Sequence, residues 1–412
     1  MTKTNVPRLR FRGFSGEWKN DKLNRISSYV DYRGKTPRLS SEGFQLITAS
    51  NIRKGYIDYN ADKKYIAVND YDDVMHRGKP NKGDVLVTTE APLGNVATVD
   101  NVNIALAQRV IKFRGETVRN KYLSYCMMTP TFQKSIFSKS TGGTVKGIKG
   151  STLVAEQINF PLDREEQQRI GSFFAKIDKI IELQTKKLEQ LKKLKQGYLQ
   201  KMFPQDGESL PRLRFSGFSG EWIKKSLSNS GVVYGGLTGK TKEDFGHGNS
   251  RFVPYISLNR NFVSYDNNTE LVNVLDSEKQ NVVKKNDILF TISSETPEEV
   301  GLSSTWLGNN ETYLNSFSFG FRFNNQTNGY FTAALFRSRD ARNKIYPLAQ
   351  GISRYNLSKK SFLSLKFRFP KLDEQQEIGE FFSKLDQLIN HQSKKIDSLK
   401  QQKKAYLQKM FI

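Results

Sequence analysis

Apolar residues recur three and four positions apart along two long stretches of the chain. The first series runs from Ile170 to Met202, and the second runs from Ile378 to Met410. This spacing places the apolar side chains on one face of a helix, and a stripe held for about five heptads is typical of a coiled coil.

Helix boundaries are predicted from capping residues. Asp163 is a good N-cap, and Glu166 follows three residues later as a capping box requires. Asp373 and Gln376 are expected to repeat this pattern in the second half. Pro and Gly within residues 203–211 end the first helix. Two helices of about 39 residues, each roughly 58 Å long at 1.5 Å per residue, are therefore expected.

The remaining sequence predicts strands mixed with short helices. Segments 83–99 and 286–306 are rich in β-forming residues with turn residues between them, and 106–115 and 314–323 also read as strands. Short helices are expected over 121–128 and 329–338. Each mixed region has about 150 residues, an ordinary size for a domain, so the predicted fold class is α+β.

The chain consists of one half of about 205 residues written twice. The segment PRLRFRGFSGEW, residues 7–18, returns as PRLRFSGFSGEW at 211–222, with eleven of twelve positions identical. Nineteen of the 34 positions in 170–203 return without a gap in 378–411. This duplication predicts two tandem domains related by a pseudo-twofold axis and separated by a long antiparallel two-helix coiled coil. The expected parts are a domain at 1–162, a helix at 163–203, a linker at 204–210, a domain at 211–372 and a helix at 373–412.

Charge narrows the class of partner. The chain of 412 residues has 65 Lys and Arg against 41 Asp and Glu, a formal net charge of +24. Such an excess favours nucleic acid as the partner over anionic lipid, although a solvated basic surface is the alternative. No run of 18 apolar residues and no signal-peptide core is found, so a cytoplasmic protein without a membrane partner is expected. The single cysteine, Cys126, excludes an internal disulfide.

The sequence offers little support for catalysis. Its three histidines, His76, His247 and His391, are far apart and do not form a metal-binding pattern with Cys126. The two Gly-Lys-Thr segments, 34–36 and 239–241, lack the earlier glycine of a phosphate-binding loop, because tyrosines stand there. No glycine-rich dinucleotide or methyl-donor motif follows a strand. The expectation is a protein that is not an enzyme and holds no metal.

Matched polar and basic loops suggest contacts with DNA. Lysine, threonine and glycine in a loop suit phosphate, while carboxylates and aromatic rings suit base edges. A simple turn or a solvated loop side chain is an equally good reading of each residue. The lysine-rich coil, including Lys195, reads chiefly as a solvated face. The candidate DNA-contacting residues are Lys35, Thr36, Asn51, Arg53, Thr89, Glu90, Lys146, Lys149, Lys240, Thr241, Asn259, Arg260, Ser294, Glu295, Arg354 and Tyr355.

The whole chain resembles the specificity subunit of a type I restriction-modification system. The resemblance rests on the repeat, on the junctions INFPLDREEQQRIGSFF (158–174) and LKFRFPKLDEQQEIGEFF (365–382), on GDVL and NDIL, and on the two YLQKMF helix ends. It implies that each variable region reads one half of a split, asymmetric DNA target. It also implies that the helices act as a spacer and dock two modification subunits. The candidate residues for these spacer helices and for subunit docking are Ile170, Phe173, Phe174, Ile177, Leu188, Leu191, Ile378, Phe381, Phe382, Leu385, Ile396 and Leu399. The second domain departs from the first where SETPEEVG replaces EAPLG.

The same resemblance assigns the chemistry to partner chains. Modification subunits would carry S-adenosylmethionine and methylate adenine, and restriction subunits would use ATP and Mg for translocation and cleavage. This chain would then carry no cofactor, and its role would be to select the DNA sequence on which the partner chains act. Two alternatives stay open: an enzyme fused to a reader, and a basic coiled-coil scaffold that binds DNA without sequence specificity.

Overall fold

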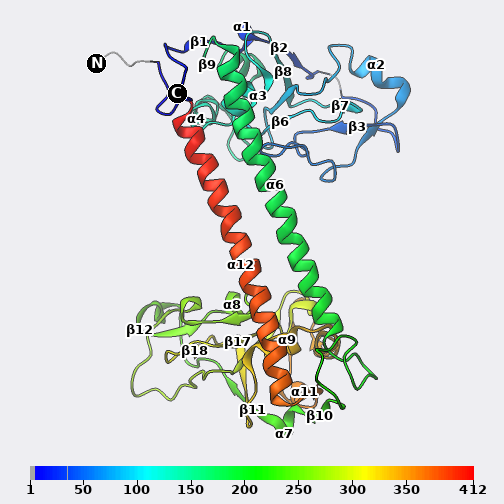
Figure 1. The fold of residues 1–412 in the computed structure, drawn as a ribbon, viewed down its shortest axis with the longest axis vertical. Helices are drawn as coiled ribbons and strands as arrows, with labels where there is room; N and C mark the ends of the chain where they lie inside the picture. Colours follow the sequence, from blue (N-terminus) through cyan, green and yellow to red (C-terminus); the bar gives the residue numbers. More distant parts are fainter. Residues whose placement is uncertain (1–4, 35) are drawn as a thin grey trace. The chain divides into compact units, whose positions relative to one another are not determined.

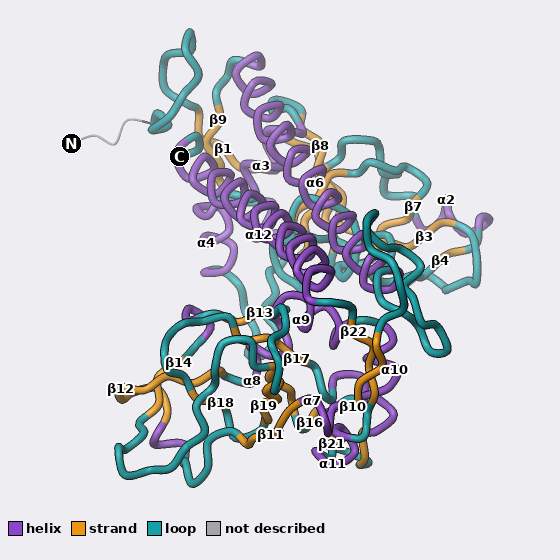
Figure 2. The backbone as a smooth tube through the Cα atoms, turned by 60° about the horizontal axis from the view of Figure 1, so that its bottom comes forward, coloured by secondary structure: helices purple, strands orange, loops and turns teal. Residues whose placement is uncertain are grey.

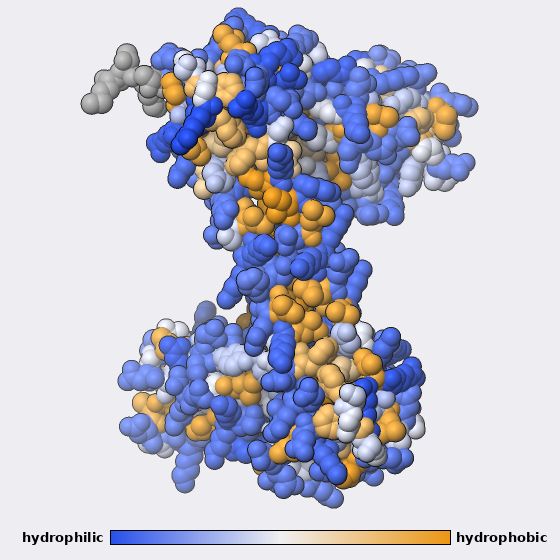
Figure 3. Space-filling model, in the orientation of Figure 1, coloured by the Kyte–Doolittle hydropathy of each residue, from blue (hydrophilic) through white to orange (hydrophobic). Residues whose placement is uncertain are grey.

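The computed structural model describes residues 5–34 and 36–412. The chain forms two compact units. Unit 1 comprises residues 1–185 with 394–412, and unit 2 comprises residues 186–393. Each unit thus contains a mixed α/β region and one end of each long helix. Unit 1 is therefore built from two stretches that are far apart in the sequence. On the face drawn in Figure 3, each unit taken by itself is mainly polar, with apolar patches.

Unit 1 is built on a four-stranded antiparallel sheet in the order β2-β8-β5-β6, beside a three-stranded sheet in the order β4-β3-β7. The central strands β5 and β8 are apolar and buried, as the predicted strands at 83–99 and 106–115 require. Helix α3 packs against β5, β6 and β8. The elements are β1 (Lys19–Lys22), α1 (Leu23–Ile26), β2 (Ser27–Asp31), β3 (Phe44–Ile47), β4 (Tyr65–Ile66), η1 (Val68–Asp70), α2 (Tyr71–Val74), β5 (Val85–Thr88), β6 (Val96–Thr98), β7 (Ile104–Leu106), β8 (Val110–Gly115), α3 (Asn120–Met127), α4 (Pro130–Ser138), α5 (Gly150–Val154), β9 (Gln157–Phe160) and α6 (Arg164–Lys201).

Unit 2 repeats this plan with additions. Its main sheet has the order β11-β19-β15-β17-β13, and β14-β12-β18 corresponds to the smaller sheet of unit 1. Helix α9 packs against β17. The elements are β10 (Ile223–Ser226), α7 (Leu227–Ser230), β11 (Gly231–Gly235), η2 (Lys242–Asp244), β12 (Phe245–Val253), α8 (Tyr255–Arg260), β13 (Val263–Ser264), η3 (Asp266–Asn268), β14 (Glu270–Val272), β15 (Ile288–Thr291), β16 (Ser293–Ser294), η4 (Pro297–Glu299), β17 (Ser303–Trp306), β18 (Tyr313–Leu314), β19 (Ser318–Phe323), α9 (Gly329–Arg337), α10 (Arg339–Ile345), η5 (Tyr346–Leu348), β20 (Ala349–Gln350), β21 (Tyr355–Leu357), α11 (Lys359–Leu363), β22 (Lys366–Phe369) and α12 (Leu372–Lys409).

The strand that leads into each long helix pairs with the strand that opens the mixed region. β9 pairs antiparallel with β1, and β22 pairs antiparallel with β10, each over four residues (Figure 2). Gln167 and Gln375 then secure the first helical turn. Their side-chain amides donate to the carbonyls of Pro161 at 2.8 Å and Pro370 at 3.1 Å. The first glutamine of each Gln-Gln pair therefore fixes the connection between the strand and the long helix.

The two long helices run antiparallel within each unit. In unit 1 α6 and α12 lie side by side (Figure 1). The carboxylate of Asp178 on α6 meets Lys403 on α12 at 2.5 Å, and Phe174 lies near Phe411, just past the end of α12. As the residue number rises along α6, the number of the residue that it contacts on the C-terminal helix segment falls, which is the pattern of antiparallel helices. Unit 2 repeats the pattern, with Lys195 against Asp386 and Phe203 near Phe382. The antiparallel pairing expected from the duplication is confirmed.

The stripe prediction needs one correction. Six of the candidate spacer-helix residues are buried, namely Ile170, Phe174, Ile378, Phe382, Leu385 and Ile396. The others, Phe173, Ile177, Leu188, Leu191, Phe381 and Leu399, are partly exposed. Three further members of the apolar series, Ile180, Leu194 and Leu388, are exposed. Antiparallel helices that diverge from strict heptad spacing leave such positions outside the seam.

The capping prediction is partly wrong. Asp163 accepts hydrogen bonds from the N–H groups of Glu165 and Glu166, which confirms it as an N-cap. The side chain of Glu166, however, is buried in a two-bond fork with Arg10 at 2.7 and 2.8 Å, so it does not close a capping box. Helix α12 begins at Leu372, which places Asp373 inside the first turn rather than at the cap.

The repeated segments 7–18 and 211–222 each fold over the end of a long helix. The N–H of Leu9 donates to the carbonyl of Lys409 at 2.8 Å, and the N–H of Leu213 donates to that of Lys201 at 2.9 Å. Arg214 forks onto Glu374 as Arg10 does onto Glu166, with both bonds at 2.7 Å. These contacts explain why this segment is nearly identical in both halves, since it joins helix end, helix start and sheet within one unit.

Candidate DNA interface

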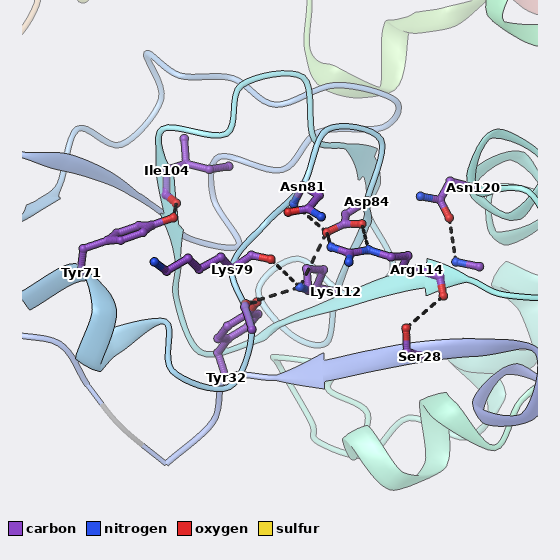
Figure 4. Close-up of polar contacts among 12 residues, drawn as sticks. Ser28, Tyr32, Tyr71, Lys79, Asn81, Asp84, Ile104, Lys112, Arg114 and Asn120 are labelled. Carbon is purple, nitrogen blue, oxygen red and sulfur yellow. Dashed lines mark hydrogen bonds and ion pairs between the residues drawn. The ribbon is translucent and has the colours of Figure 1, made fainter.

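A buried ion pair holds the strand that opens the interface of unit 1. Asp84, in the GDVL segment, is almost fully buried and accepts both bonds of the Arg114 guanidinium at 2.8 Å (Figure 4). Its carboxylate also accepts the N–H of Asn81 at 2.8 Å. Lys112 lies 3.7 Å away and donates to the carbonyl of Lys79 at 2.8 Å, and burial lowers the pKa of this lysine. The network fixes the start of β5 relative to β8.

Unit 2 contains the same network in its NDIL segment. Asp287 is buried and accepts two bonds from Arg322 at 2.8 and 2.6 Å. The hydroxyl of Tyr234 adds a third bond at 2.6 Å, and burial together with the charge of Asp287 raises the pKa of that tyrosine. Gly83 and Asn286 precede the two aspartates, with φ of 89° and 71°. The matched left-handed residue and the fork show that these segments have the same structural role in both units.

Beyond β5, three separate segments of unit 1 join through backbone hydrogen bonds. The N–H of Thr89 donates to the carbonyl of Arg109, and the N–H of Ile148 donates to the carbonyl of Thr89, both at 2.9 Å. A hairpin closes beside them, because Thr141 and Gly147 exchange two bonds of 2.9 Å. We call this set of segments, 88–90, 107–109 and 141–148, the ladder of unit 1.

Unit 2 builds the same ladder from segments 291–294, 315–317 and 349–357. The N–H of Ile292 donates to the carbonyl of Phe317 at 3.0 Å, and the N–H of Leu357 donates to the carbonyl of Ile292 at 2.8 Å. Strands β20 and β21 form the matching hairpin. Gly142 and Gly351 open the two hairpin turns with φ of 104° and 144°, a region that favours glycine.

The two ladders present different side chains. In unit 1 the half-exposed Arg109 lies 3.3 Å from the carboxylate of Glu90, and Lys146 is exposed on the hairpin. In unit 2 Phe317 occupies the place of Arg109 and is 61% exposed, and Ile352 in the hairpin turn is 95% exposed. The backbone frame is thus constant while the chemistry that it displays is not.

A groove of about 400 Å³ adjoins the ladder of unit 1. Its walls combine apolar side chains such as Leu46 with Thr48, Ser50 and Asp62, and Arg109 lies at its edge. The hydroxyls of Thr48 and Ser50 both lie 3.2 Å from the carboxylate of Asp62. The groove therefore offers hydrogen-bond donors and acceptors beside apolar surface, the combination that reads base edges.

Comparison with known proteins identifies the family. A family model described as the type I restriction modification DNA specificity domain matches residues 18–193 and 223–401. The chain belongs to this family. The match is double, and it covers both mixed regions together with most of both long helices. Membership supports sequence-specific recognition of DNA as the role of the chain.

Individual relatives agree with this assignment. The specificity subunit of the type I restriction enzyme MjaIX from Methanocaldococcus jannaschii is 34% identical over 116 residues, which are 27% of this chain and 26% of that protein. The chain thus matches about a quarter of the length of this relative. The S subunit of a type I restriction-modification system from M. genitalium superposes with a TM-score of 0.58 at 16% identity, over 99% of both chains. A chain of a type I system studied for complex assembly gives 0.60 at 15%, over 95% of this chain and 97% of that one. At such identities the likeness shows the fold alone.

Within this type I specificity fold, the ladders bring together some of the residues expected to contact DNA. Thr89, Glu90 and Lys146 belong to the ladder of unit 1, and Ser294 and Tyr355 to that of unit 2. Thr36 lines the groove of unit 1. Exposed side chains are found at Thr36, Arg53, Lys146, Lys149, Thr241, Arg260, Glu295 and Arg354. Lys35 lies outside the described residues.

Four of the residues expected to contact DNA have buried side chains. Asn51 is fully buried, and its amide donates to the carbonyls of Asp58 and Asp62 at 3.0 Å. The side chains of Thr89 and Ser294 are also buried, and only their backbones take part in the ladders. Lys240 has a side chain only 4% exposed, and its ammonium meets the carboxylate of Glu278 at 2.5 Å. The lysine of the Gly-Lys-Thr segment in unit 2 thus makes an internal contact.

Further candidates have local structural roles. Thr241 caps the turn η2, where its hydroxyl and N–H both bond Asp244. Arg53 pairs with Asp58 at 3.6 Å. The carbonyl of Asn259 accepts from Arg337, which is buried beneath helix α8. Lys195, read from the sequence as part of a solvated face, is mostly buried against Asp386. Burial lowers the pKa of Lys195, while the aspartate opposes that shift.

Sequence reasoning missed Gln108, Arg109, Phe317 and Ile352. Residues 108 and 109 were part of a predicted strand, and the strand in fact begins at Val110. One signal was available: Ile352 is an apolar residue in a glycine-bearing hairpin, where no core lies within reach. The pairing of 107–109 with 88–90 and 148 has no sequence signature, because it is made entirely of backbone bonds.

Outside the ladders, the described residues offer neither a metal cluster nor a reactive thiol. Within residues 5–34 and 36–412, no group of three His, Cys, Asp or Glu could hold a metal ion. Burial raises the pKa of the Cys126 thiol to about 12, which leaves it unreactive at neutral pH. Among the described helices, none has the length and apolarity needed to cross a membrane.

Proposed function

We propose that this chain is the DNA-specificity subunit of a type I restriction-modification complex. Each unit reads one half of a bipartite, asymmetric target in double-stranded DNA. Two modification subunits, bound through the long helices, methylate adenine with S-adenosylmethionine, and restriction subunits use ATP and Mg. The chain itself binds no cofactor and performs no chemistry, and the complex works in the cytoplasm on the genome.

The observation that carries this proposal is the pair of ladders. Both units build the same three-segment frame with the same hydrogen bonds, yet Arg109 in one unit corresponds to Phe317 in the other. A frame that holds its shape without using these side chains leaves them free to differ. Different side chains on equal frames are what two different half-sites require, since base edges are read by side-chain chemistry.

Charge supports DNA as the ligand. The net charge of +24 supplies the sequence-independent attraction to phosphate on which readout is built. Exposed Lys146 and Lys149 lie in or directly after the hairpin of unit 1, and Arg354 lies in that of unit 2. Exposed apolar residues on the long helices, including Ile180 and Leu388 at equivalent positions, support docking of one modification subunit at each.

Methylation mapping tests the proposal. The chain is co-expressed with a modification subunit in a host that lacks adenine methylation, and methylated adenines are located genome-wide. The expected result is one split sequence with two unlike halves. A chimera in which residues 19–157 come from another member of the family should change one half only.

A binding assay separates this function from that of a nonspecific scaffold. The assembled complex is titrated with a duplex carrying the mapped sequence and with a shuffled duplex of equal length and composition. Specific recognition predicts a preference of about 1,000-fold or more at physiological salt. Equal affinity for both duplexes would instead establish the scaffold, and methyl transfer by the isolated chain would establish an enzyme.

A further inference from the structure

We propose that the two units read their half-sites by different chemistry: unit 2 recognises thymine through apolar contacts of Phe317 and Ile352 with the 5-methyl group, whereas unit 1 recognises guanine through Arg109. The inference rests on the proposed function. It adds which residues decide the base, and which base each unit prefers.

The fold uses only the backbone of Phe317. Its N–H donates to Oδ1 of Asn315 at 3.0 Å, and its carbonyl accepts the N–H of Ile292 at 3.0 Å. Asn315 is buried and also bonds the carbonyl of Val253, so the turn is held from within. The phenyl ring nevertheless remains 61% exposed. No packing role accounts for an aromatic side chain at this position.

Ile352 is exposed to an even greater extent. It follows Gly351, and the turn it occupies is closed by the pairing of Gln350 with Asn356 across β20 and β21. The residue is 95% exposed, so it forgoes the stabilisation that burial of an apolar side chain brings. A β-branched residue in a glycine-bearing turn is no aid to the turn itself.

Both apolar side chains belong to one ladder, together with Arg354 and Tyr355. Ile292 joins the segment of Phe317 on one side to the segment of Leu357 on the other through backbone bonds. An exposed arginine thus stands two residues from Ile352 on the same hairpin. Apolar tips beside a cation fit the major groove, where thymine alone among the four bases offers a methyl group at the base edge.

In unit 1 the position equivalent to Phe317 is occupied by Arg109, a side chain of different chemistry. The carbonyl of Arg109 accepts the N–H of Thr89 in the corresponding ladder bond, and Arg109 has a φ of 73°. Its guanidinium is held 3.3 Å from Glu90, which pre-orients a side chain that pairs with two acceptors of guanine. The O6 and N7 atoms of a guanine edge would offer two acceptors to the N–H groups of the same guanidinium. The contrast between Arg109 and Phe317 is therefore a contrast of base preference.

The test uses duplexes of the mapped target in which single thymines are replaced by deoxyuridine, which removes only the 5-methyl group. The probe is each such duplex, bound by the full chain assembled with its modification subunits. At contacted positions of one half-site, deoxyuridine should weaken binding roughly three- to fivefold, the effect expected for one methyl group left in water. Phe317→Ala and Ile352→Ala should each reduce this discrimination toward unity.

Two variants serve as comparisons. Leu275→Ala removes an apolar side chain of unit 2 that is 57% exposed but lies outside the ladder, and it should leave thymine–uracil discrimination unchanged. Arg109→Ala should weaken the preference for guanine at one position of the other half-site. It should leave thymine–uracil discrimination in the first half-site unchanged. Equal binding of thymine and deoxyuridine duplexes by the specific wild-type complex would overturn the inference while the proposed function stands. Loss of preference in the same half-site by Phe317→Ala and by Arg109→Ala would also overturn it, and absence of any preferred sequence would overturn the proposed function itself.

Discussion

The ammonium of Lys195 on α6 lies 2.5 Å from the carboxylate of Asp386 on α12 and 3.5 Å from the centroid of the Phe262 ring. The equivalent pair in unit 1 joins Lys403 to Asp178 at 2.5 Å, with the Tyr125 ring 5.3 Å from the ammonium. Each unit therefore fixes its segment of the helix pair with one Lys–Asp bridge placed against an aromatic side chain.

We expect Asp386→Asn to destabilise unit 2 by about 2–4 kcal/mol, because it leaves a mostly buried ammonium without its counter-charge. Lys195→Met with Asp386→Leu should recover much of that loss, since the pair is replaced by apolar side chains. Urea unfolding of the single and double variants gives the coupling free energy. A coupling near zero would show that the bridge does not hold the helices. The exposed pair of Lys179 and Glu182, 3.0 Å apart, is the control, and its removal should cost less than about 1 kcal/mol.

Two glycines of α6 should respond oppositely to alanine. A Cβ at Gly171 would lie 2.9 Å from Cβ of Lys121 and 3.1 Å from the backbone nitrogen of Tyr122, so the helix would have to move away from α3. At Gly197 nothing lies within 4 Å of the added atom. We expect Gly197→Ala to stabilise by about 0.5–1 kcal/mol through helix propensity, and Gly171→Ala to destabilise by about 1–3 kcal/mol through overpacking. Thermal unfolding of both variants checks the signs, and stabilisation by both would show that helix propensity alone governs these sites.

The contact between Lys240 and Glu278 should make unit 2 sensitive to acid. A hydrogen bond from Lys240 lowers the pKa of Glu278 to about 2, against 4.5 for the free group. The folded-state pKa is depressed, so the stabilisation is complete above about 4.5 and is lost as the pH falls from there toward 2. Urea midpoints measured between pH 7 and 3 should show wild type losing its advantage over Glu278→Gln in that window. Lys240→Met should remove the same pH-dependent difference, and an advantage that does not shrink between pH 5 and pH 3 would contradict the assignment.

The buried fork of Asp84 and Arg114 should be structural. Asp84→Asn leaves the guanidinium without a counter-charge and weakens the bond that holds β5 against β8, so we expect unit 1 to lose about 3–5 kcal/mol. Limited proteolysis should show cleavage within 19–157 before cleavage within 223–370. If instead the variant is as stable as wild type but reads a changed half-site, the fork would belong to the interface.

Much of the fold could be predicted from the sequence. The strands and short helices expected at 83–99, 106–115, 121–128 and 329–338 are present as β5, β6, β8, α3 and α9. The spacing of apolar residues and the identity of capping residues are local properties, so a short stretch of sequence is enough to predict the elements that depend on them. Prediction failed where a local motif was used for a distant contact, as when Glu166 turned to Arg10 instead of closing its own cap.

The candidate site could be predicted only in outline. The matched loops were visible, but Asn51 and Lys240 resemble exposed phosphate ligands in sequence and are buried in the structure. Whether a polar side chain meets water or an internal partner depends on which segments pack over it. No spacing along the chain reports that.

The sequence by itself determined the duplication, the antiparallel helix pair and the kind of partner, because repetition, apolar period and net charge are all written along the chain. Only the tertiary structure decided which loop residues share a surface. Arg109, Thr89 and Ile148 meet through backbone bonds, which every residue type offers, so their side chains carry no mark of the pairing. For the same reason those side chains are free to differ between the two units.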